Sequence, residues 1–477
     1  MIDTSGAPLA AGAAARSVGR AVRLIRLPNL ALRAVDVAER FLDLPGLVLL
    51  ECARPGRTAR WSYLSAGPVA VLDAPTHGPE PLAGARVLVR RLAAGSVAEG
   101  PPFVGGLVGY LGYDLGRRFE RIPSIARADQ GLPVLRLALH DWVLAWDRRT
   151  GDAWLGGRAV DGDVRGLERR LADTAARLDD PAPAAVAEGP PDELRFRSGL
   201  GRPAYMRGVE EIREAIASGE LYQANLARRL EARFAGDPWP VYRRLRTGDP
   251  ALFSAYLDLG PAEESGARRA ILSASPEPFL AVQPDGRVAT DPIKGTRARG
   301  RTREEDRALA RELLASAKDR AENVMLVDVL RNDLGRVARP GSVRVPRLCR
   351  LERTAAVQHL VSTVTARLAP GRDQFDLLAA AFPGGSITGA PKIRAMELLE
   401  ELEPVRRGPY TGAIGWVGPD GAMATSIAIR TIVADGRRLT LHVGGGITWR
   451  SDPAAEWDET VAKARGPLSA IGGREVD

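Results

Sequence analysis

The chain has 477 residues, enough for two or more domains and a large buried core. Hydrophobic residues make up 45% and charged residues 26%, and no apolar run approaches the ~18 residues of a membrane span. Two distant cysteines, Cys52 and Cys349, exclude a disulfide framework and favour a reducing cytoplasm. The net charge of +8 suggests nucleic-acid binding as an alternative, but no block of five like charges occurs.

Along the first part of the chain, short apolar runs alternate with turns. Residues 1–20 lack the apolar core of a signal peptide and are expected to form a flexible tail. Region 21–178 is expected to contain strands at 47–50, 69–72, 87–92 and 140–146 and a helix at 167–178. Residues 179–195, rich in Pro, Ala and acidic side chains, are expected to link it to a second region, 196–472.

The second region mixes helical and strand periodicities. Helices are expected at 205–218, 318–330, 375–381, 391–402 and 453–464, and Thr302 with Glu305 forms a capping-box pattern that starts another. Strands are expected at 221–234, 270–278, 286–293, 413–417, 424–433 and 439–442. The pattern predicts an α+β fold in which antiparallel strands are surrounded by helices.

The choice of basic residue is unusual. Four of the 67 basic residues are lysine (Lys294, Lys318, Lys392 and Lys463), and the rest are arginine. Because arginine supplies the general positive charge, we expect each lysine to lie where an ammonium or a neutral amine is specifically needed.

Two expected helices carry paired carboxylates. Asp319 and Glu322 are three residues apart on one helix, and Glu456 and Glu459 repeat this spacing on another. Residues at this spacing share a helix face, so two such faces in contact would form an oxygen site suited to Mg²⁺. The alternative is that both are ordinary solvated faces.

Three further segments each permit two interpretations. Lys294 lies between Pro292 and Gly295, where stiff backbone could aim its amine, or it is a surface lysine. Residues 386–392 precede a helix and could offer N–H groups to an anion, or form an ordinary cap. Gly444 to Gly446 follow a strand and could form an oxyanion-binding bend, or a tight turn.

In their order and spacing, these segments resemble the chorismate-utilising enzymes, which include anthranilate, isochorismate and salicylate synthases, and within them component I of aminodeoxychorismate synthase. The motifs that carry the resemblance are Ser275-Pro276-Glu277, Pro292-Ile293-Lys294-Gly295-Thr296, Ala317-Lys318-Asp319-Arg320-Ala321-Glu322-Asn323, residues 382–392 (FPGGSITGAPK) and Gly444-Gly445-Gly446-Ile447. The resemblance covers 24–113 loosely and 203–470 closely. It implies a two-lobed antiparallel β-sandwich surrounded by helices.

The resemblance also implies a set of site residues. Glu322 and Glu459 match direct Mg²⁺ ligands; Glu456 and Asp319 match ligands acting through water, although Asp319 stands where Glu is often found. The residues matching the grip on the enolpyruvyl carboxylate of chorismate are Tyr410, Arg430, Gly445 and Gly446. Lys463 matches a residue near the metal-bound carboxylate, and the ring-lining positions are Gly295, Thr296, Thr388 and His359, the last counted as catalytic.

Two positions discriminate among members of the family. Gln223 stands where the water-adding enzymes carry a lysine base, and Gln cannot deprotonate water. Lys294 stands where anthranilate synthases carry Ala, which favours amination of chorismate at C4 over C2. Lys294 is then expected to attack C2 as a covalent nucleophile, with Glu277 as the proton donor and acceptor. Anthranilate synthase component I remains the alternative.

The resemblance implies partners as well. Neither cysteine lies in an amidotransferase motif, so ammonia is expected from a separate glutamine amidotransferase subunit. The product would serve folate or another p-aminobenzoate-derived pathway, in the cytoplasm and without nucleic acid or membrane. The N-terminal region of this family can hold tryptophan, and residues 49–52 resemble the edge of that site.

Overall fold

The fold is taken from a computed structural model that describes residues 15–17, 21–28, 30, 32–54, 60–95, 97, 99–180, 193–263, 265–353 and 357–476. Of the expected tail, Ala15–Ser17 forms a short strand, β1, and the rest lies outside the described residues. Most of the expected linker, residues 181–192, also lies outside them.

The strands of the described residues form two sheets, one of 14 strands and one of 10. In spatial order the larger sheet contains β1, β2 (Val22–Leu27), β9 (Ala153–Arg158), β8 (Trp142–Asp147), β4 (Trp61–Ser65), β3 (Val48–Glu51), β12 (Phe253–Pro261), β13 (Arg268–Ser275), β22 (Thr431–Ala434), β23 (Arg438–Ile447), β11 (Gln223–Arg233), β10 (Leu194–Ser198) and β24 (Gly473–Val476), with β19 (Gly389–Ala390) beside β11. The smaller contains β16 (Ile293–Ala298), β18 (Val357–Arg367), β15 (Arg287–Thr290), β14 (Pro278–Val282), β21 (Met423–Ile427), β20 (Ala413–Val417), β6 (Gly106–Leu111), β7 (Leu135–His140) and β5 (Ala70–Ala74), with β17 (Arg344–Arg353) beside β18. Among the pairs of named strands in the described residues, only β10 and β24 run parallel.

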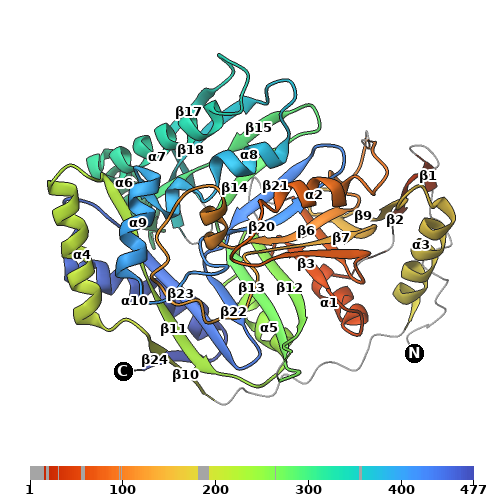
Figure 1. Cartoon of the computed structure of the whole chain (residues 1–477), viewed down its shortest axis with the longest axis horizontal. Helices are drawn as coiled ribbons and strands as arrows, with labels where there is room; N and C mark the ends of the chain where they lie inside the picture. Colours follow the sequence, from red (N-terminus) through yellow and green to blue (C-terminus); the bar gives the residue numbers. More distant parts are fainter. Residues whose placement is uncertain are drawn as a thin grey trace.

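The two sheets pack face to face (Figure 1). One hydrophobic cluster joins them: Tyr63 and Ile271 come from the larger sheet, and Val108 and Trp416 from the smaller. Alternate residues of each strand supply this interior, as expected of a β-sandwich. The predicted α+β sandwich is confirmed.

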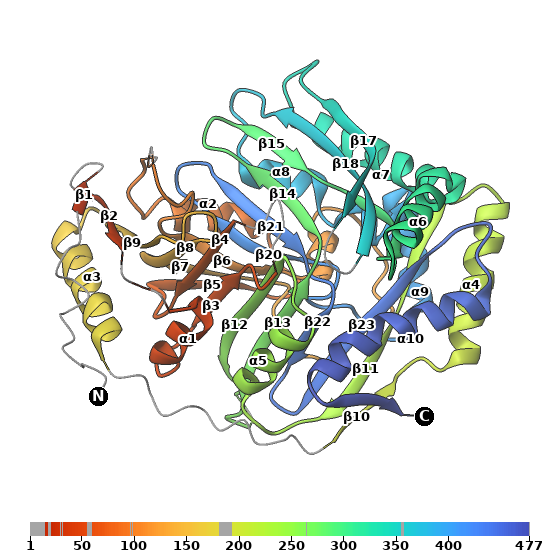
Figure 2. The same ribbon diagram turned by 180° about the vertical axis from the view of Figure 1, so that it is seen from behind.

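Helices surround the sandwich. They are α1 (Ala34–Ala38), α2 (Leu82–Val89), α3 (Val164–Asp179), α4 (Arg202–Ala217), α5 (Pro238–Gly248), α6 (Arg303–Ala315), α7 (Ala317–Gly335), α8 (Gln374–Ala381), α9 (Lys392–Leu402) and α10 (Pro453–Ala470). Figure 2 shows α5 and α10 lying across the larger sheet. Within the described residues, no helix is both long enough and apolar enough to cross a membrane.

Both sheets draw strands from both halves of the chain. β3 pairs with β12 in the larger sheet, and β6 pairs with β20 in the smaller. The regions expected at 21–178 and 196–472 therefore share one sandwich, and the boundary between them remains a prediction.

Three local predictions are wrong. Residues 87–92 do not form a strand; α2 covers 82–89, and its buried Leu82, Ala85 and Val89 follow a helical spacing. The strand expected at 424–433 is two strands in different sheets, separated at Arg430, which adopts a left-handed φ of 49°. The glycines of 444–446 form neither bend nor turn but continue β23.

Candidate active site

The predicted site residues gather where β16 of the smaller sheet approaches β23 of the larger. Lys294 lies on β16, and its Nζ is 3.7 Å from the place where a Cβ on Gly446 would stand. The Gln223 amide nitrogen is only 2.4 Å from that place, so a side chain at position 446 would collide with it. Gln223 is 1% exposed, and neither of its amide atoms has a hydrogen-bond partner among the described residues.

Helix α10 brings a row of charged side chains to β23. It begins at an Asp-Pro pair, in which the Asp452 carboxylate caps the helix by accepting from the Ala455 N–H. Glu456 accepts from the Ser451 hydroxyl at 2.6 Å. Lys463 donates to the Gly444 carbonyl at 2.8 Å and pairs with Glu459 at 2.7 Å. Glu456, Glu459 and Lys463 are three and four residues apart, so they share the face of α10 that lies against β23.

Helix α7 supplies the second pair of carboxylates. Ser316 caps it, and the buried Asn323 amide fixes it to the sheet by donating to the Leu360 carbonyl at 3.2 Å. Asp319 pairs with Arg297 of β16 at 3.3 Å, and Glu322 lies 3.9 Å from Lys318. The helix is therefore tied to the strand that carries Lys294.

Glu322 of α7 and Glu459 of α10 interact electrostatically across the two helices. Burial raises the pKa of Glu322, and Asp319 and Glu459 add to the rise. Burial also raises the pKa of Glu456, but for Glu459 the neighbouring Lys463, Lys294 and Lys318 outweigh burial and lower the pKa. Carboxylate oxygens are suitable ligands for Mg²⁺. As the side chains stand, however, no group of three or more metal-binding side chains clusters among the described residues. Instead, Glu322 and Glu459 lie against lysines, and Asp319 pairs with Arg297.

Glu277 follows β13 and faces the same lysines. Burial raises the pKa of this carboxyl to about 7, while Lys294, a hydrogen bond from Ser386 and Lys463 partly oppose the rise. A carboxyl with a pKa near neutrality can both give and accept a proton, as a general acid and base must.

His359 lies on β18, opposite Thr296 of β16, and Arg430 lies between β21 and β22. The imidazole Nδ1 of His359 is 2.9 Å from the Thr296 hydroxyl, and burial lowers the pKa of the ring to about 4, helped by Arg430. The Arg430 guanidinium lies 3.6 Å from Asp249. Thr388 turns its hydroxyl back to the Gly384 carbonyl, at 2.5 Å, and its own carbonyl accepts from the Asn225 N–H at 2.8 Å.

Tyr410 lies on the loop that follows α9, with its ring 4% exposed. Its hydroxyl is hydrogen-bonded to the Asn225 side chain. The fully buried Tyr205 reaches the same place, since its hydroxyl is 3.8 Å from the would-be Cβ of Gly445.

Tyr205 and Ser386 were missed as site residues by sequence reasoning. Tyr205 reads as part of the apolar face of α4, and Ser386 reads as part of a loop. Only the packing of distant segments brings either residue to Glu277 or to Gly445.

A separate cavity of about 220 Å³ opens at the N-terminal segment expected to resemble a tryptophan site. Its lining includes Leu50, Glu51, Cys52, Trp61 and Ser254. The Ser254 hydroxyl is buried and has no hydrogen-bond partner among the described residues. Glu51 is held there by two hydrogen bonds from Arg246.

Comparison with known proteins places this chain among chorismate enzymes. A family model described as chorismate binding enzyme matches residues 52–469. Anthranilate synthase component 1 of Streptomyces coelicolor is 42% identical over 443 residues, covering 90% of this chain and 84% of that protein. Aminodeoxychorismate synthase component 1 of Klebsiella aerogenes is 44% identical over 362 residues, covering 76% of each.

The solved structures agree with the sequence comparisons. Anthranilate synthase component I of Streptococcus pneumoniae superposes with a TM-score of 0.76 at 31% identity, covering 87% of this chain and 93% of that one. Its fold is the two-sheet architecture described above. On the family match and these relatives together, the chain belongs to the chorismate binding enzyme family.

Proposed function

We propose that the chain is the synthase subunit of an aminodeoxychorismate synthase, which converts chorismate and ammonia to 4-amino-4-deoxychorismate. The observation that carries the proposal is the placement of Lys294, whose amine faces Gly446 and interacts with Glu277. In the resembling anthranilate synthases this position is Ala, which offers no nucleophile.

The proposed reaction has two steps. The neutral Lys294 amine forms a bond to C2 of chorismate, the ring double bonds shift, and the C4–oxygen bond breaks while Glu277 protonates the departing hydroxyl to water. Ammonia then bonds to C4, the double bonds shift back and the C2–nitrogen bond breaks, and Glu277 takes the excess proton. The shift of the Glu277 pKa to about 7 supports this double role.

Substrate orientation is assigned to the surrounding residues. Tyr410 and Arg430, with the backbone of Gly445 and Gly446, are proposed to hold the enolpyruvyl carboxylate. Gly295, Thr296, Thr388 and His359 are proposed to line the ring. Arginine suits such a carboxylate because its planar fork donates two parallel hydrogen bonds.

Mg²⁺ is proposed to bind between α7 and α10. Glu322 and Glu459 would hold it directly, Asp319 and Glu456 would act through water, and the ion would supply a positive site for the ring carboxylate of chorismate. The rise that Glu459 causes in the pKa of Glu322 supports their nearness. Because Lys463 pairs with Glu459, the ion would have to displace this ammonium.

Magnesium binding can be tested without turnover. We expect Mg²⁺ to raise the melting temperature of the wild-type chain and to have little effect on Glu322→Gln, because an amide lacks the charge of the ligand it replaces. Calorimetric titration with Mg²⁺ alone would measure the affinity directly. Equal Mg²⁺ affinity in both proteins would contradict the assignment.

The remaining parts of the proposal concern partners and setting. We propose that a separate glutamine amidotransferase supplies ammonia, in a cytoplasmic enzyme of folate or other p-aminobenzoate-derived synthesis. The cavity beside Glu51 and Ser254 is proposed to hold tryptophan, whose ammonium would meet the carboxylate and whose ring would meet Trp61. A tryptophan-dependent rise in melting temperature, lost in Glu51→Gln, would support this assignment.

Anthranilate synthase component I is the second candidate. It is favoured by the coverage of 90% of this chain by the Streptomyces coelicolor relative. Product analysis separates the two: the purified chain is incubated with chorismate, Mg²⁺ and an ammonium salt at alkaline pH, and the product is identified by mass spectrometry and chromatography. Formation of 4-amino-4-deoxychorismate supports the first proposal, and formation of anthranilate the second.

A further inference from the structure

The side chain of Tyr410 is held in place by a stacking contact and a hydrogen bond. Its ring stacks on the His442 imidazole, with the ring centroids 5.1 Å apart and the planes inclined by only 11°. The Asn225 side chain donates to the phenol oxygen, since this bond lowers the pKa of the phenol. The phenol proton is then left for a second acceptor.

His442 is buried in a position that keeps it neutral. It lies on β23, two residues before Gly444, and pairs with Arg229 of the neighbouring β11. Burial holds the pKa of its imidazole well below the ordinary value, and the cations of Arg229 and Arg407 hold it lower still. The ring is therefore uncharged at neutral pH and presents a flat surface to Tyr410.

The same imidazole is tied to the loop that carries Tyr410. It is hydrogen-bonded to the backbone of Arg406, and its Nε2 has no partner among the described residues, so Nδ1–H is the donor. One ring thus contacts Tyr410 by stacking and fixes the backbone four residues earlier.

Arg407 anchors this loop from within. Its guanidinium is 1% exposed and binds the Glu403 carboxylate through Nε at 2.8 Å and Nη2 at 2.6 Å. It also donates to the Ile387 carbonyl at 2.9 Å and lies 5.9 Å from the centroid of the Tyr410 ring. The loop, the segment before α9 and the phenol are therefore fixed to one another.

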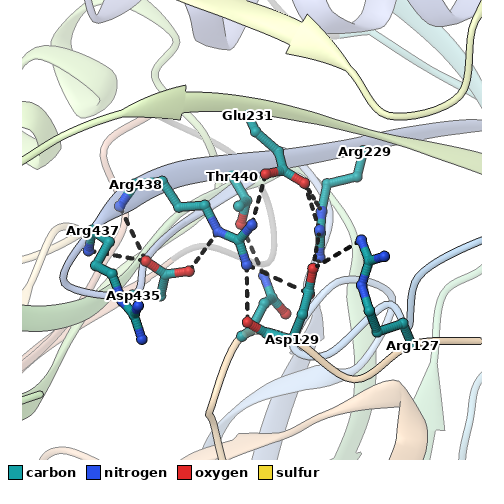
Figure 3. Close-up of polar contacts among 9 residues, drawn as sticks. Arg127, Asp129, Arg229, Glu231, Asp435, Arg437, Arg438 and Thr440 are labelled. Atoms are coloured by element: carbon teal, nitrogen blue, oxygen red, sulfur yellow. Dashed lines mark hydrogen bonds and ion pairs between the residues drawn. The ribbon is translucent and has the colours of Figure 1, made fainter. Parts of the chain in front are cut away.

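An ion-pair network lies next to His442, which stands opposite Arg229 on the neighbouring strand. Figure 3 shows Asp129 between Arg127, Arg229 and Arg438. Arg127 pairs with Val405, so the network also fastens the start of the Tyr410 loop. The network thereby joins β11 and β23, the strand that carries His442, to the segment before Tyr410.

We propose that His442 is a positioning residue for the substrate carboxylate: it orients the Tyr410 ring so that the phenol proton points to the enolpyruvyl group of chorismate. The inference rests on the proposed role of Tyr410 in holding that carboxylate. His442 itself touches no substrate and acts only through Tyr410.

The test compares two replacements of the ring. In His442→Leu the space is filled but no flat ring remains, and we expect the KM and the calorimetric Kd for chorismate to rise ~10-fold while kcat changes less than about threefold, because ground-state binding is lost. In His442→Phe a flat ring returns, and both constants should lie within about twofold of wild type.

A double-mutant cycle tests whether the effect passes through Tyr410. Tyr410→Phe removes the hydroxyl, so adding His442→Leu to it should cost nothing further in chorismate affinity. The proposal would be overturned if the two substitutions raised the Kd for chorismate independently, so that their fold-changes multiplied in the double variant. A wild-type KM in His442→Leu would also overturn it.

Controls separate positioning from stability. Phe41→Leu disrupts another buried ring pair, with Trp142 at 5.4 Å, and should lower the melting temperature without changing KM. Chorismate affinity is measured without ammonia, so it does not depend on which carbon is aminated. If the wild type made anthranilate, the proposed function would fail while the His442 result would still stand.

Discussion

The few lysines of this chain interact with carboxylates, and three of them lie at the candidate site. Lys294, Lys318 and Lys463 all act on the carboxylates of α7 and α10. The fourth, Lys392, is used structurally: its ammonium pairs with Asp333 at 2.8 Å and donates to the Ala381 carbonyl at 3.0 Å, which joins α9 to α7 and α8. In a chain that uses arginine elsewhere, all four lysines thus interact with carboxylates, and a specific need for an ammonium or a neutral amine at each remains a prediction.

Lys294→Ala tests the proposed nucleophile. We expect formation of 4-amino-4-deoxychorismate to fall at least ~10²-fold, the low end for losing one positioned catalytic group. Chorismate should still bind, because Tyr410 and Arg430 are unchanged, and calorimetry would show this. Near-normal C4 amination by the variant would refute the covalent role.

Glu277 makes the stability of the protein depend on pH. Its pKa is about 7 in the folded chain against 4.5 for the ordinary group, so the unfolded chain ionises first as pH rises. Folding free energy is therefore lost progressively between about pH 4.5 and 7, up to about 3 kcal/mol for a shift of this size.

Glu277→Gln should remove this loss, since an amide does not ionise. In urea unfolding, the variant should gain stability relative to wild type between pH 4.5 and 8. An equal difference in unfolding free energy between variant and wild type at pH 4.5 and at pH 8 would show that Glu277 has an ordinary pKa. Ser386→Ala offers an internal check, because loss of its hydrogen bond should raise the pKa of Glu277 further.

Among the elements, β16 and α7 form the contact that sets the position of Lys294. Gly295 has a φ of +75°, and a Cβ there would lie 2.9 Å from both Asp319 Cβ and Leu313 Cδ1. The strand can approach the helix this closely only because the side chain is absent.

Gly295→Ala should therefore destabilise the protein and displace the amine. Gly286→Ala is a matched control, because Gly286 also has a positive φ, of +80°, but its Cβ would meet only Leu368 Cβ, at 3.7 Å. We expect Gly295→Ala to cost ~1–3 kcal/mol more than the control in denaturant unfolding, since overpacking adds to backbone strain. Equal losses of unfolding free energy in the two variants would show that α7 moves aside at little cost. Turnover should fall only in Gly295→Ala.

The elements also show what periodicity can and cannot predict. The helices that carry paired carboxylates were predicted because a repeat of three or four residues is visible in any single segment. The error at 87–92 arose because Val87, 67% exposed, was grouped with buried neighbours into a strand-like run. The break at Arg430 could not be predicted, since the chain changes sheets there and no local pattern records which sheet a strand joins.

The site residues, like the elements, could be predicted only in part from the sequence. Motif resemblance identified Lys294, Glu277 and the four acids, which the structure places around β16 and β23. It did not identify Tyr205 or His442, whose contacts depend on strand register and on helix packing. His442, for example, reads as an ordinary residue of an apolar strand until β23 is paired with β11.

At the scale of the whole molecule, the proposed site residues depend on both sheets for their position. The smaller sheet carries Lys294, the larger carries Gly445 and Gly446, and helices packed outside carry the acids. Because β3 pairs with β12 and β6 with β20, the N-terminal half of the chain holds both sheets in place. The sandwich thus sets the distance between the proposed nucleophile, Lys294, and the glycines proposed to hold the enolpyruvyl carboxylate.

Neither cysteine is suited to release ammonia from glutamine. Burial raises the pKa of the Cys52 thiol to about 12, and the thiol donates to the Trp61 carbonyl at 3.2 Å. Cys349 is buried, 5% exposed, beside Asn323 of α7. A glutaminase needs an accessible thiolate, which neither residue provides.

The isolated chain should therefore turn over chorismate with ammonium salts and not with glutamine. Free ammonia needs no thiol, so product should increase with pH as the ammonium ion is deprotonated. Glutamine, tested at the same concentration as total ammonium and at pH 7 and 9, should give no more product than buffer. Cys52→Ser and Cys349→Ser should leave ammonia-dependent turnover close to that of the wild type, provided that their melting temperatures are unchanged. Glutamine-dependent turnover by the isolated chain, lost on replacing either cysteine, would show that the chain carries its own glutaminase and needs no partner subunit.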